Sequence, residues 1–299
     1  MTAASRPATP SERAALAGSP DPAAGSPAST GPPAPVASSA PAVAQRAAMA
    51  ADAVRTADGR PVRIAVVDYG MGNRRSVEKA LEHAGAPASV TADPDMIRAA
   101  DGLVLCGVGA FPAGAERLRT SGLGGLVRDR VADGVPLLGI CLGMQLLLDR
   151  SDERGGAEGL GLLSGSVRVL TDRGDLKLPH IGWNVVRWTD TAGDRRLDAG
   201  TADEAAVGAA TAAGDATVDA HATVRAGLPD RAAFYHVHSH VAHPDDPSIV
   251  VAHGDYGGPF VTAVGRGRVH GVQFHPEKSS LDGLRLLRSF AATSARCAT

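Results

Sequence analysis

The sequence predicts an α/β fold with a parallel central sheet that carries helices on both of its faces. Apolar runs of strand length alternate with amphipathic helical segments from residue 62 to residue 140, which is typical of strands connected by helices. After residue 248 the pattern changes to short apolar runs separated by glycine turns, which indicates a small antiparallel strand set near the C-terminal part. Ligands of such sheets bind at the carboxyl ends of the parallel strands, so functional residues are expected there.

The expected elements follow one another in a regular order. A buried strand at 62–68 leads through a Gly/Asn loop to an amphipathic helix at 75–84, which Gly85 ends. Asp93 and Pro94 suit the N-cap and the first position of the next helix. The remaining elements are a strand at 102–106, helices near 113–119 and 123–133, a strand at 135–140, short strands at 248–253, 260–264 and 269–274, and a closing helix at 281–291.

Two segments interrupt this pattern. Residues 1–61 are rich in Ala, Pro and Ser and hold no aromatic residue, so they cannot bury enough apolar surface to fold and are predicted to form a disordered tail. Interspersed acidic residues such as Glu12 disfavour the alternative of a transit peptide. Translation from Met49 instead of Met1 is a further hypothesis. Residues 191–228 have a similar composition and are predicted to be a disordered insertion in the domain at 62–299.

Composition and charge exclude several classes of protein. The net charge is -2 at pH 7 and the pI is about 6.5, so no global field attracts nucleic acid or an anionic membrane. No apolar run reaches the roughly 20 residues that a membrane span needs. The three cysteines, Cys106, Cys141 and Cys297, form no CxxC pair, which argues against a disulfide framework or a zinc site and favours a cytoplasmic location. No cofactor is expected.

Cys141 stands where an apolar strand gives way to an apolar helix, between Gly139 and Gly143. Small flanking residues permit a sharp strand-to-helix turn that exposes the cysteine side chain and leaves the backbone N–H of Leu142 free at the helix start. The positive end of the following helix also stabilises a thiolate. The pattern therefore predicts a nucleophile with an adjacent oxyanion donor, in preference to an ordinary buried thiol.

The stretch that ends in His275-Pro276-Glu277 supplies a candidate base. Proline favours an extended conformation for the residue before it, so the side chains of His275 and Glu277 can point the same way and the carboxylate can orient the imidazole. Other histidines compete, because His236, His238, His240 and His243 are spaced like residues of a strand or a metal cluster. No cysteine or paired carboxylate completes that cluster, so no metal site is predicted.

Gly139-Ile-Cys-Leu-Gly-Met-Gln145 and Val272-Gln-Phe-His-Pro-Glu277 together resemble the two signatures of the class I glutamine amidotransferases. The resemblance implies a flavodoxin-like domain that hydrolyses L-glutamine to glutamate and ammonia. It also implies that Cys141 is the nucleophile, His275 the acid and base, and Glu277 its orienter. Leu142, Val108 and Gly109 are implied to bind the oxyanion, and Gln145 to contact glutamine.

Further strings are similar to one branch of that family, the glutaminase subunits of imidazole glycerol phosphate synthases. They begin at Asp68-Tyr-Gly-Met-Gly-Asn, at Gly107-Val-Gly-Ala-Phe and at Pro179-His-Ile-Gly-Trp-Asn. The resemblance implies a heterodimer with a cyclase subunit, which uses the ammonia to form imidazole glycerol phosphate and aminoimidazole carboxamide ribotide in histidine biosynthesis. The residues implied at or near that interface are Asn73, Arg75, Trp183, Asn184, Tyr235 and Lys278.

Two departures from the family pattern stand out. Cys106 replaces a proline that usually precedes Gly107, and His236 and His240 stand where aromatic residues are more common. A thiol beside the oxyanion strand suggests the hypothesis that Cys106 alters that strand or becomes oxidised with Cys141. Two other functions remain as alternatives, a cysteine hydrolase acting on a peptide or thioester and a catalytically silent protein that regulates a cyclase.

Overall fold

The computed structural model describes residues 44, 48, 52–170, 176–189 and 220–298. Most of the predicted N-terminal tail and residues 191–219 of the predicted insertion therefore lie outside the described residues. Where the described part overlaps those two segments, it shows regular structure, as set out below.

Five parallel strands form one half of the sheet, in the order β2-β1-β3-β4-β13. They are β1 (Ile64–Val67), β2 (Ala88–Thr91), β3 (Gly102–Gly107), β4 (Leu137–Cys141) and β13 (Val269–Val272). Every residue of the four inner strands is buried, because helices cover both faces of this half. The predicted parallel sheet is confirmed, and Cys141 lies at the carboxyl end of one of its central strands.

The second half of the sheet is mostly antiparallel and larger than the sequence predicted. It contains β5 (Leu148–Ser151), β6 (Ala157–Glu158), β7 (Leu163–Val169), β8 (His180–Trp188), β9 (Arg231–His238), β10 (His240–Pro244), β11 (Val250–Asp255) and β12 (Pro259–Arg266). β12 joins this half to β13, and β11 leads from β12 to β8 and β9. Strands on both sides of the 190–219 segment thus pair with one another.

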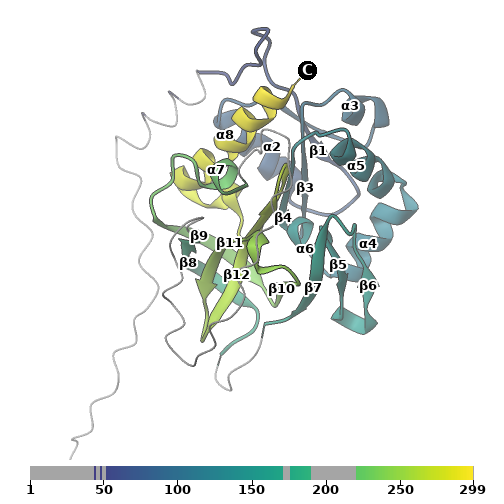
Figure 1. Cartoon of the computed structure of the whole chain (residues 1–299), viewed down its shortest axis with the longest axis vertical. Helices are drawn as coiled ribbons and strands as arrows, with labels where there is room; N and C mark the ends of the chain where they lie inside the picture. The colour runs from purple at the N-terminus through teal and green to yellow at the C-terminus, as the bar shows by residue number, and fades with distance from the viewer. Residues whose placement is uncertain (1–43, 45–47, 49–51, 171–175, 190–219, 299) are drawn as a thin grey trace, which may run out of the picture. The chain divides into compact units, whose positions relative to one another are not determined.

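The helices divide between the two faces of the sheet (Figure 1). One face is covered by α2 (Arg74–His83), α7 (Ala220–Arg225) and α8 (Ser280–Cys297). The other face carries α3 (Pro94–Arg98), α4 (Phe111–Thr120), α5 (Leu123–Ala132) and α6 (Leu142–Leu146). Three short 3-10 turns complete the described elements: η1 (Glu153–Gly155), η2 (Pro247–Ile249) and η3 (Pro276–Lys278).

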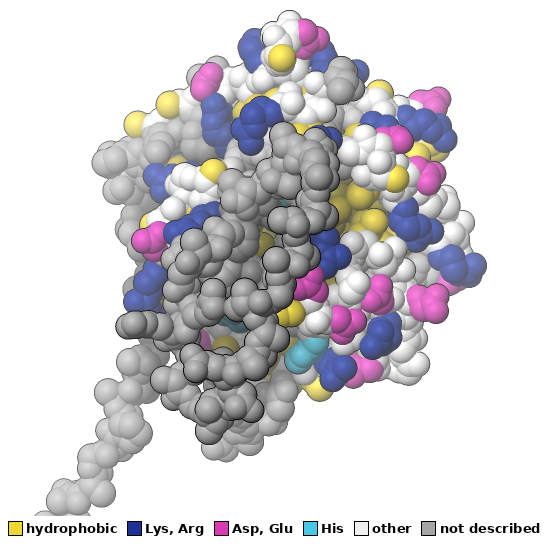
Figure 2. All heavy atoms as spheres, viewed as in Figure 1, with side chains coloured by type: hydrophobic (Ala, Val, Ile, Leu, Met, Phe, Trp, Pro, Cys, Tyr) yellow, Lys and Arg dark blue, Asp and Glu magenta, His cyan; other side chains and the backbone are white. Residues whose placement is uncertain are grey.

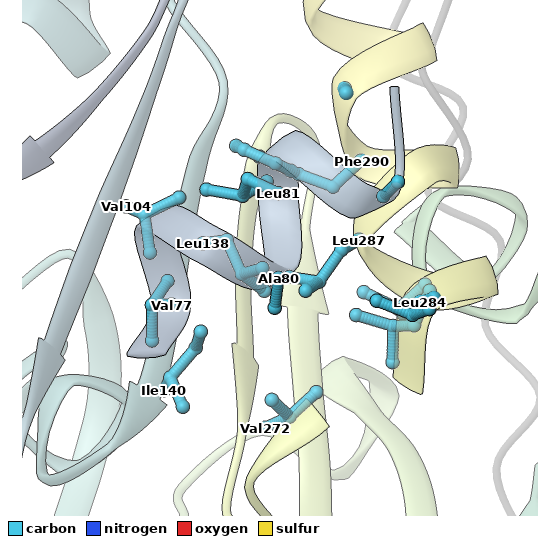
Figure 3. Packing of buried hydrophobic residues seen from close by; sticks show 14 of the residues in the cluster. Val77, Ala80, Leu81, Val104, Leu138, Ile140, Val272, Leu284, Leu287 and Phe290 are labelled. Carbon is cyan, nitrogen blue, oxygen red and sulfur yellow. The ribbon is translucent and has the colours of Figure 1, made fainter. Parts of the chain in front are cut away.

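The larger core cluster lies between the sheet and the pair α2 and α8 (Figure 3). Val77 and Leu81 of α2 meet Leu287 and Phe290 of α8 over Leu138 of β4, and all five side chains are fully buried. Each such side chain contributes roughly 1.5–3 kcal/mol when it is removed from water. This packing fixes the start of α2 and the η3 turn beside the carboxyl end of β4, where Cys141 lies.

Local signals in the sequence explain several helix ends. The side chain of Asp93 accepts a hydrogen bond from the backbone N–H of Asp95 at 2.8 Å, which confirms the predicted cap and first proline of α3. Gly85 follows α2 with φ of 79°, a left-handed conformation that glycine adopts without a steric penalty.

Residues 52–61, which composition assigned to the tail, contact the domain. Val54 is buried, its N–H donates to the carbonyl of Gly85 at 2.8 Å, and Arg55 forms a β-bridge with Pro61. Asp52 pairs with Arg288 of α8 at 2.6 Å. The described contacts of the domain therefore begin about ten residues before Val62, because one apolar side chain and one ion pair anchor a segment of low overall hydrophobicity.

The helix α7 lies inside the segment that was predicted to be an insertion. Its Val224 is fully buried in the core cluster that also contains α8. One large apolar residue among Ala, His, Thr and Arg gives a weak periodic signal, so only tertiary packing reveals that this helix belongs to the domain.

On the face drawn in Figure 2, the Lys and Arg side chains of the described residues are interspersed with Asp and Glu. Over the described residues, every helix is too short or too polar to span a bilayer.

Candidate active site

Cys141 sits in a strained backbone conformation at the junction of β4 and α6. Its φ of 54° and ψ of -111° place a non-glycine residue outside the usual regions, a strain of order 1–3 kcal/mol that recurs at functional sites. The turn closes because both flanking glycines lack a Cβ. A Cβ on Gly143 would collide with the carbonyl oxygen of Leu105, and one on Gly139 would lie 2.8 Å from the backbone of Gly143. The predicted sharp turn is confirmed, but the predicted exposure of the cysteine is wrong, because Cys141 is only 7% exposed.

His275 and Glu277 form a buried pair just after β13. Nδ1 of His275 lies 2.6 Å from Oε1 of Glu277, and their side chains are 1% and 0% exposed. The backbone is fixed on both sides of His275: its N–H donates to the carbonyl of Tyr235 at 2.8 Å, and the Ser279 hydroxyl donates to the carbonyl of His275 at 2.6 Å. The two side chains therefore meet as the His-Pro-Glu spacing predicted.

The protonation state of His275 follows from three competing effects. Burial favours the neutral imidazole and lowers its pKa, but interactions with Cys141 and with the Glu277 carboxylate outweigh burial and raise the pKa to about 9. Nε2 of His275 is buried and makes no hydrogen bond within the described residues, so it is the ring nitrogen left free for a reacting group. At neutral pH the imidazole is accordingly protonated and can act as an acid.

A pocket of about 590 Å³ opens beside Cys141. Its lining includes all five residues expected at the nucleophile and the oxyanion or substrate site, namely Val108, Gly109, Cys141, Leu142 and Gln145. Val108 and Gly109 follow the end of β3, and Leu142 begins α6, where the first backbone N–H groups have no intrahelical partner. Strand ends that are distant in sequence thus form one concave site.

Gln273 was not singled out from the sequence, yet its amide lies between two site residues. Its Nε2 donates to Sγ of Cys141 at 3.8 Å, and its Oε1 accepts from Nε2 of Gln145 at 3.0 Å. Gln145 also donates to the carbonyl of His240 at 3.1 Å. The sequence signal that could have identified Gln273 is its position between the apolar residues Val272 and Phe274. A buried amide at such a position requires hydrogen-bond partners in the interior.

The residues expected at a partner surface fall into two groups. Trp183 and Tyr235 are paired across β8 and β9 with ring centroids 6.3 Å apart, and Nζ of Lys278 lies 5.7 Å from the centre of the Tyr235 ring. Arg75 is exposed on α2, where it pairs with Glu78 at 2.8 Å. The aromatic and charged groups of these four residues therefore lie at or near the surface.

Asn73 and Asn184, by contrast, use their amides within the domain. Asn184 donates to the backbone carbonyl of Asp255 at 2.7 Å. Asn73 donates a hydrogen bond to Oε1 of Glu277. Sequence spacing could not show this second contact, since 204 positions separate the two residues.

Three histidines meet beside the pocket, and one of them, His238, lines it. Nδ1 of His180 lies 3.1 Å from Nε2 of His238, and the rings of His180 and His236 stack at 5.3 Å. Burial lowers the pKa of His180 to about 4 and that of His238 to about 3, so both are neutral at physiological pH. His236 bonds to the hydroxyl of Thr262 at 2.7 Å. Within the described residues, no group of three or more His, Cys, Asp or Glu side chains is arranged to hold a metal ion.

Cys106 is buried in β3, one residue before Gly107. Burial, reinforced by the charge of Glu277, raises the pKa of its thiol to about 12. The thiol form dominates at neutral pH, which disfavours reaction with oxidants because the thiolate is the reactive species.

Comparisons with known proteins agree with this geometry. The family model for class-I glutamine amidotransferases matches residues 65–293. Relatives named imidazole glycerol phosphate synthase subunit HisH include one from Rhodopirellula baltica, 42% identical, and one from Methylococcus capsulatus, 43% identical. Each alignment covers 76% of this chain, with 96% of the first relative and 94% of the second.

A solved glutamine amidotransferase has a similar fold, with a TM-score of 0.53 at 18% identity, over 77% of this chain and 98% of that one. The flavodoxin-like α/β architecture expected from the sequence is therefore confirmed. On this evidence the chain belongs to the class-I glutamine amidotransferase family and, within it, to the HisH glutaminase subunits of imidazole glycerol phosphate synthase.

Proposed function

We propose that this chain hydrolyses L-glutamine through Cys141, His275 and Glu277 and delivers the ammonia to a cyclase subunit in the cytoplasm. The observation that carries the proposal is the buried 2.6 Å contact between His275 and Glu277, which stands beside a strained cysteine elbow that opens into a pocket. A nucleophile, a base and an orienting carboxylate in this arrangement match the requirements of acyl transfer from an amide.

In the first half of the reaction, the Cys141 thiolate attacks the side-chain amide carbon of glutamine. The C–S bond forms, and the carbonyl electron pair moves to oxygen. The imidazolium of His275 then donates its Nε2 proton to the departing nitrogen, so that the C–N bond breaks and ammonia leaves. The raised pKa of His275, about 9, supports this role as an acid at neutral pH.

In the second half, His275 acts as base. It accepts a proton from water, the hydroxide attacks the thioester, and glutamate and the Cys141 thiolate are released. Negative charge appears on the former carbonyl oxygen in both halves. We assign its stabilisation to backbone N–H groups of Leu142 and of the Val108-Gly109 segment, and the loss of one such donor costs roughly 3–4 kcal/mol. We also assign a contact with bound glutamine to Gln145, which lines the pocket.

The cyclase would dock on a surface formed by Trp183, Tyr235, Lys278 and the exposed side of α2. Ser76 and Lys79 of α2 line a pocket of about 470 Å³ together with Trp183, Glu277 and Lys278. This pocket shares no lining residue with the glutamine pocket, and Glu277, whose side chain is buried, is one of its lining residues.

Arg75 lies on the same helix, and Asn184 lies next to Trp183 on β8. The cyclase would convert the ammonia and a phosphorylated acceptor into imidazole glycerol phosphate and aminoimidazole carboxamide ribotide, as the HisH relatives' name, a synthase subunit, suggests.

The test is the rate of glutamate formation by the chain alone, with a cyclase subunit, and with cyclase plus an acceptor analogue. We expect the rate to rise strongly in the ternary mixture and to fall at least about 1,000-fold in Cys141→Ala. High activity without a partner would indicate an uncoupled hydrolase, and no activity in any mixture would indicate a silent regulator. Either result overturns the proposal.

A further inference from the structure

Asn73 has a backbone conformation and a side-chain contact that its position in α2 does not explain. It is the N-cap residue of α2, and an asparagine there normally accepts a hydrogen bond from the first turn. Here it makes no cap hydrogen bond, and its φ of 73° is left-handed, a conformation that costs a non-glycine residue free energy. The side chain is therefore used for something other than helix initiation.

The amide of Asn73 donates to Oε1 of Glu277, the same oxygen that lies 2.6 Å from Nδ1 of His275. The side chain of Glu277 is fully buried, and its Oε2 has no hydrogen-bond partner within the described residues. Apart from the imidazole, Asn73 is the described donor that holds this carboxylate. A hydrogen bond to a charged group contributes more than one between neutral groups.

We propose that Asn73 is a positioning residue for the triad, fixing the Glu277 carboxylate in the place where it orients and charges His275. The inference rests on the proposed function, because it concerns the geometry of the same catalytic residues. It follows that the loop between β1 and α2 contributes to catalysis without contacting glutamine, since Asn73 is not among the residues that line the Cys141 pocket.

Two variants of Asn73 separate a chemical role from a structural one. Asn73→Gly removes the amide and relieves the left-handed backbone, so the fold should be at least as stable as in the wild type. Asn73→Asp keeps the shape but, when ionised, cannot donate and repels Glu277. When an acidic medium protonates it, its O–H can donate again, so the variant restores the hydrogen bond as the pH falls.

The experiment measures glutamine kcat, KM and thermal stability in the complex with cyclase, from pH 5.5 to pH 9. We expect kcat to fall about 10-fold in Asn73→Gly at unchanged KM, which corresponds to the loss of a hydrogen bond to a charged group. We expect the deficit of Asn73→Asp to shrink toward acid pH relative to wild type. Glu116→Gln is the control, because Glu116 is exposed on α4, on the other face of the sheet from the proposed docking surface, and its side chain pairs only with Arg119 among the described contacts.

Wild-type kcat in Asn73→Gly would overturn the inference, and so would a deficit of Asn73→Asp that is the same at every pH. Cys141→Ala and His275→Ala distinguish this failure from failure of the proposed function. If those two variants are inactive while Asn73→Gly retains full kcat, only the role of Asn73 is wrong. If they retain activity, the triad itself is wrong.

Discussion

At Cys141 the chain passes from strand to helix within one residue, and the neighbouring glycines make this turn possible. Gly143 packs against the carbonyl of Leu105 with no room for a methyl group, which brings α6 close to β3. The close approach keeps Leu142 and the Val108-Gly109 segment on the same pocket. The positions of the proposed nucleophile and oxyanion donors thus depend on the absence of one Cβ atom.

We expect Gly143→Ala to destabilise the domain by about 1–3 kcal/mol and to abolish glutaminase activity, because the added methyl group pushes α6 away from β3. Gly125→Ala is the matched control. Gly125 also lies in a helix but has open space around its Cβ position, so its replacement should be neutral or stabilise by about 0.5–1 kcal/mol. Urea unfolding of both variants provides the comparison, and equal stabilities would contradict this account of the elbow.

The raised pKa of His275 predicts a limit on activity at alkaline pH. In the proposed mechanism the imidazolium is the acid that protonates the leaving nitrogen, so kcat/KM should fall as the pH rises through about 9. In Glu277→Gln the carboxylate that raises this pKa is absent, so the alkaline limb should move to lower pH. A pH profile of glutamine hydrolysis from pH 6 to pH 10.5 measures both, and an unmoved limb in the variant would argue against the pair.

Among the elements, the segment before β1 has a clearer structural role than its composition suggests. Val54 packs into the core, and Asp52 pairs with Arg288 in the middle of α8. These contacts link the segment to α8, and the hydrogen bond from Val54 to Gly85 links it to the end of α2. The N-terminal boundary of the domain is therefore set by a few specific contacts.

We expect a chain that begins at Met49 to retain the stability of the full chain, and a chain that begins at Val62 to lose roughly 1.5–3 kcal/mol. That loss corresponds to the removal of one buried valine from the core. The midpoints of urea unfolding for the two chains provide the measurement. Equal midpoints would mean that residues 52–61 contribute nothing to the fold.

On the scale of the whole molecule, buried neutral histidines make stability depend on pH. Burial lowers the pKa of His238 and of His270 to about 3, against 6.5 for the unfolded chain. When folding lowers the pKa of a histidine, the folded state is most stable at pH values above the pKa that this histidine has in the unfolded chain. Stability is then lost as the pH falls from about 6.5 toward the folded value, by up to roughly 1.4 kcal/mol per group and pH unit.

His270 allows a direct test of this dependence, because neither of its ring nitrogens has a hydrogen-bond partner within the described residues. His270→Leu removes the orphaned polar atoms and the titrating group together. We expect the variant to be at least as stable as wild type at pH 7.5 and to lose less stability between pH 7 and pH 5. Thermal melting across that range checks the slope, and an unchanged slope would contradict the assignment.

Periodicity and turn residues predicted most elements of the parallel half, but they missed the edge strand β2 and placed β13 in the antiparallel set, whereas it also pairs in parallel with β4. The strand containing Cys106, the cap at Asp93 and the helix that Gly85 ends all lie close to their expected bounds. The antiparallel half was predicted only in its last strands. β7 and β8 have alternating or partly exposed side chains and are completed by β9 and β10, which follow the 190–219 segment, so no local pattern identifies their pairing.

By itself, the sequence determined the class of fold, the cysteine elbow and the His-Pro-Glu spacing, because each depends on steric and periodic rules that act over a few residues. Only the tertiary structure decided that Gln273 joins Gln145 to Cys141 and that Asn73 turns inward to Glu277. It also showed the contacts of Val54 and α7 with the core. These features arise from side chains that meet across long stretches of chain, and their distances are set by the packing of the whole sheet and its helices.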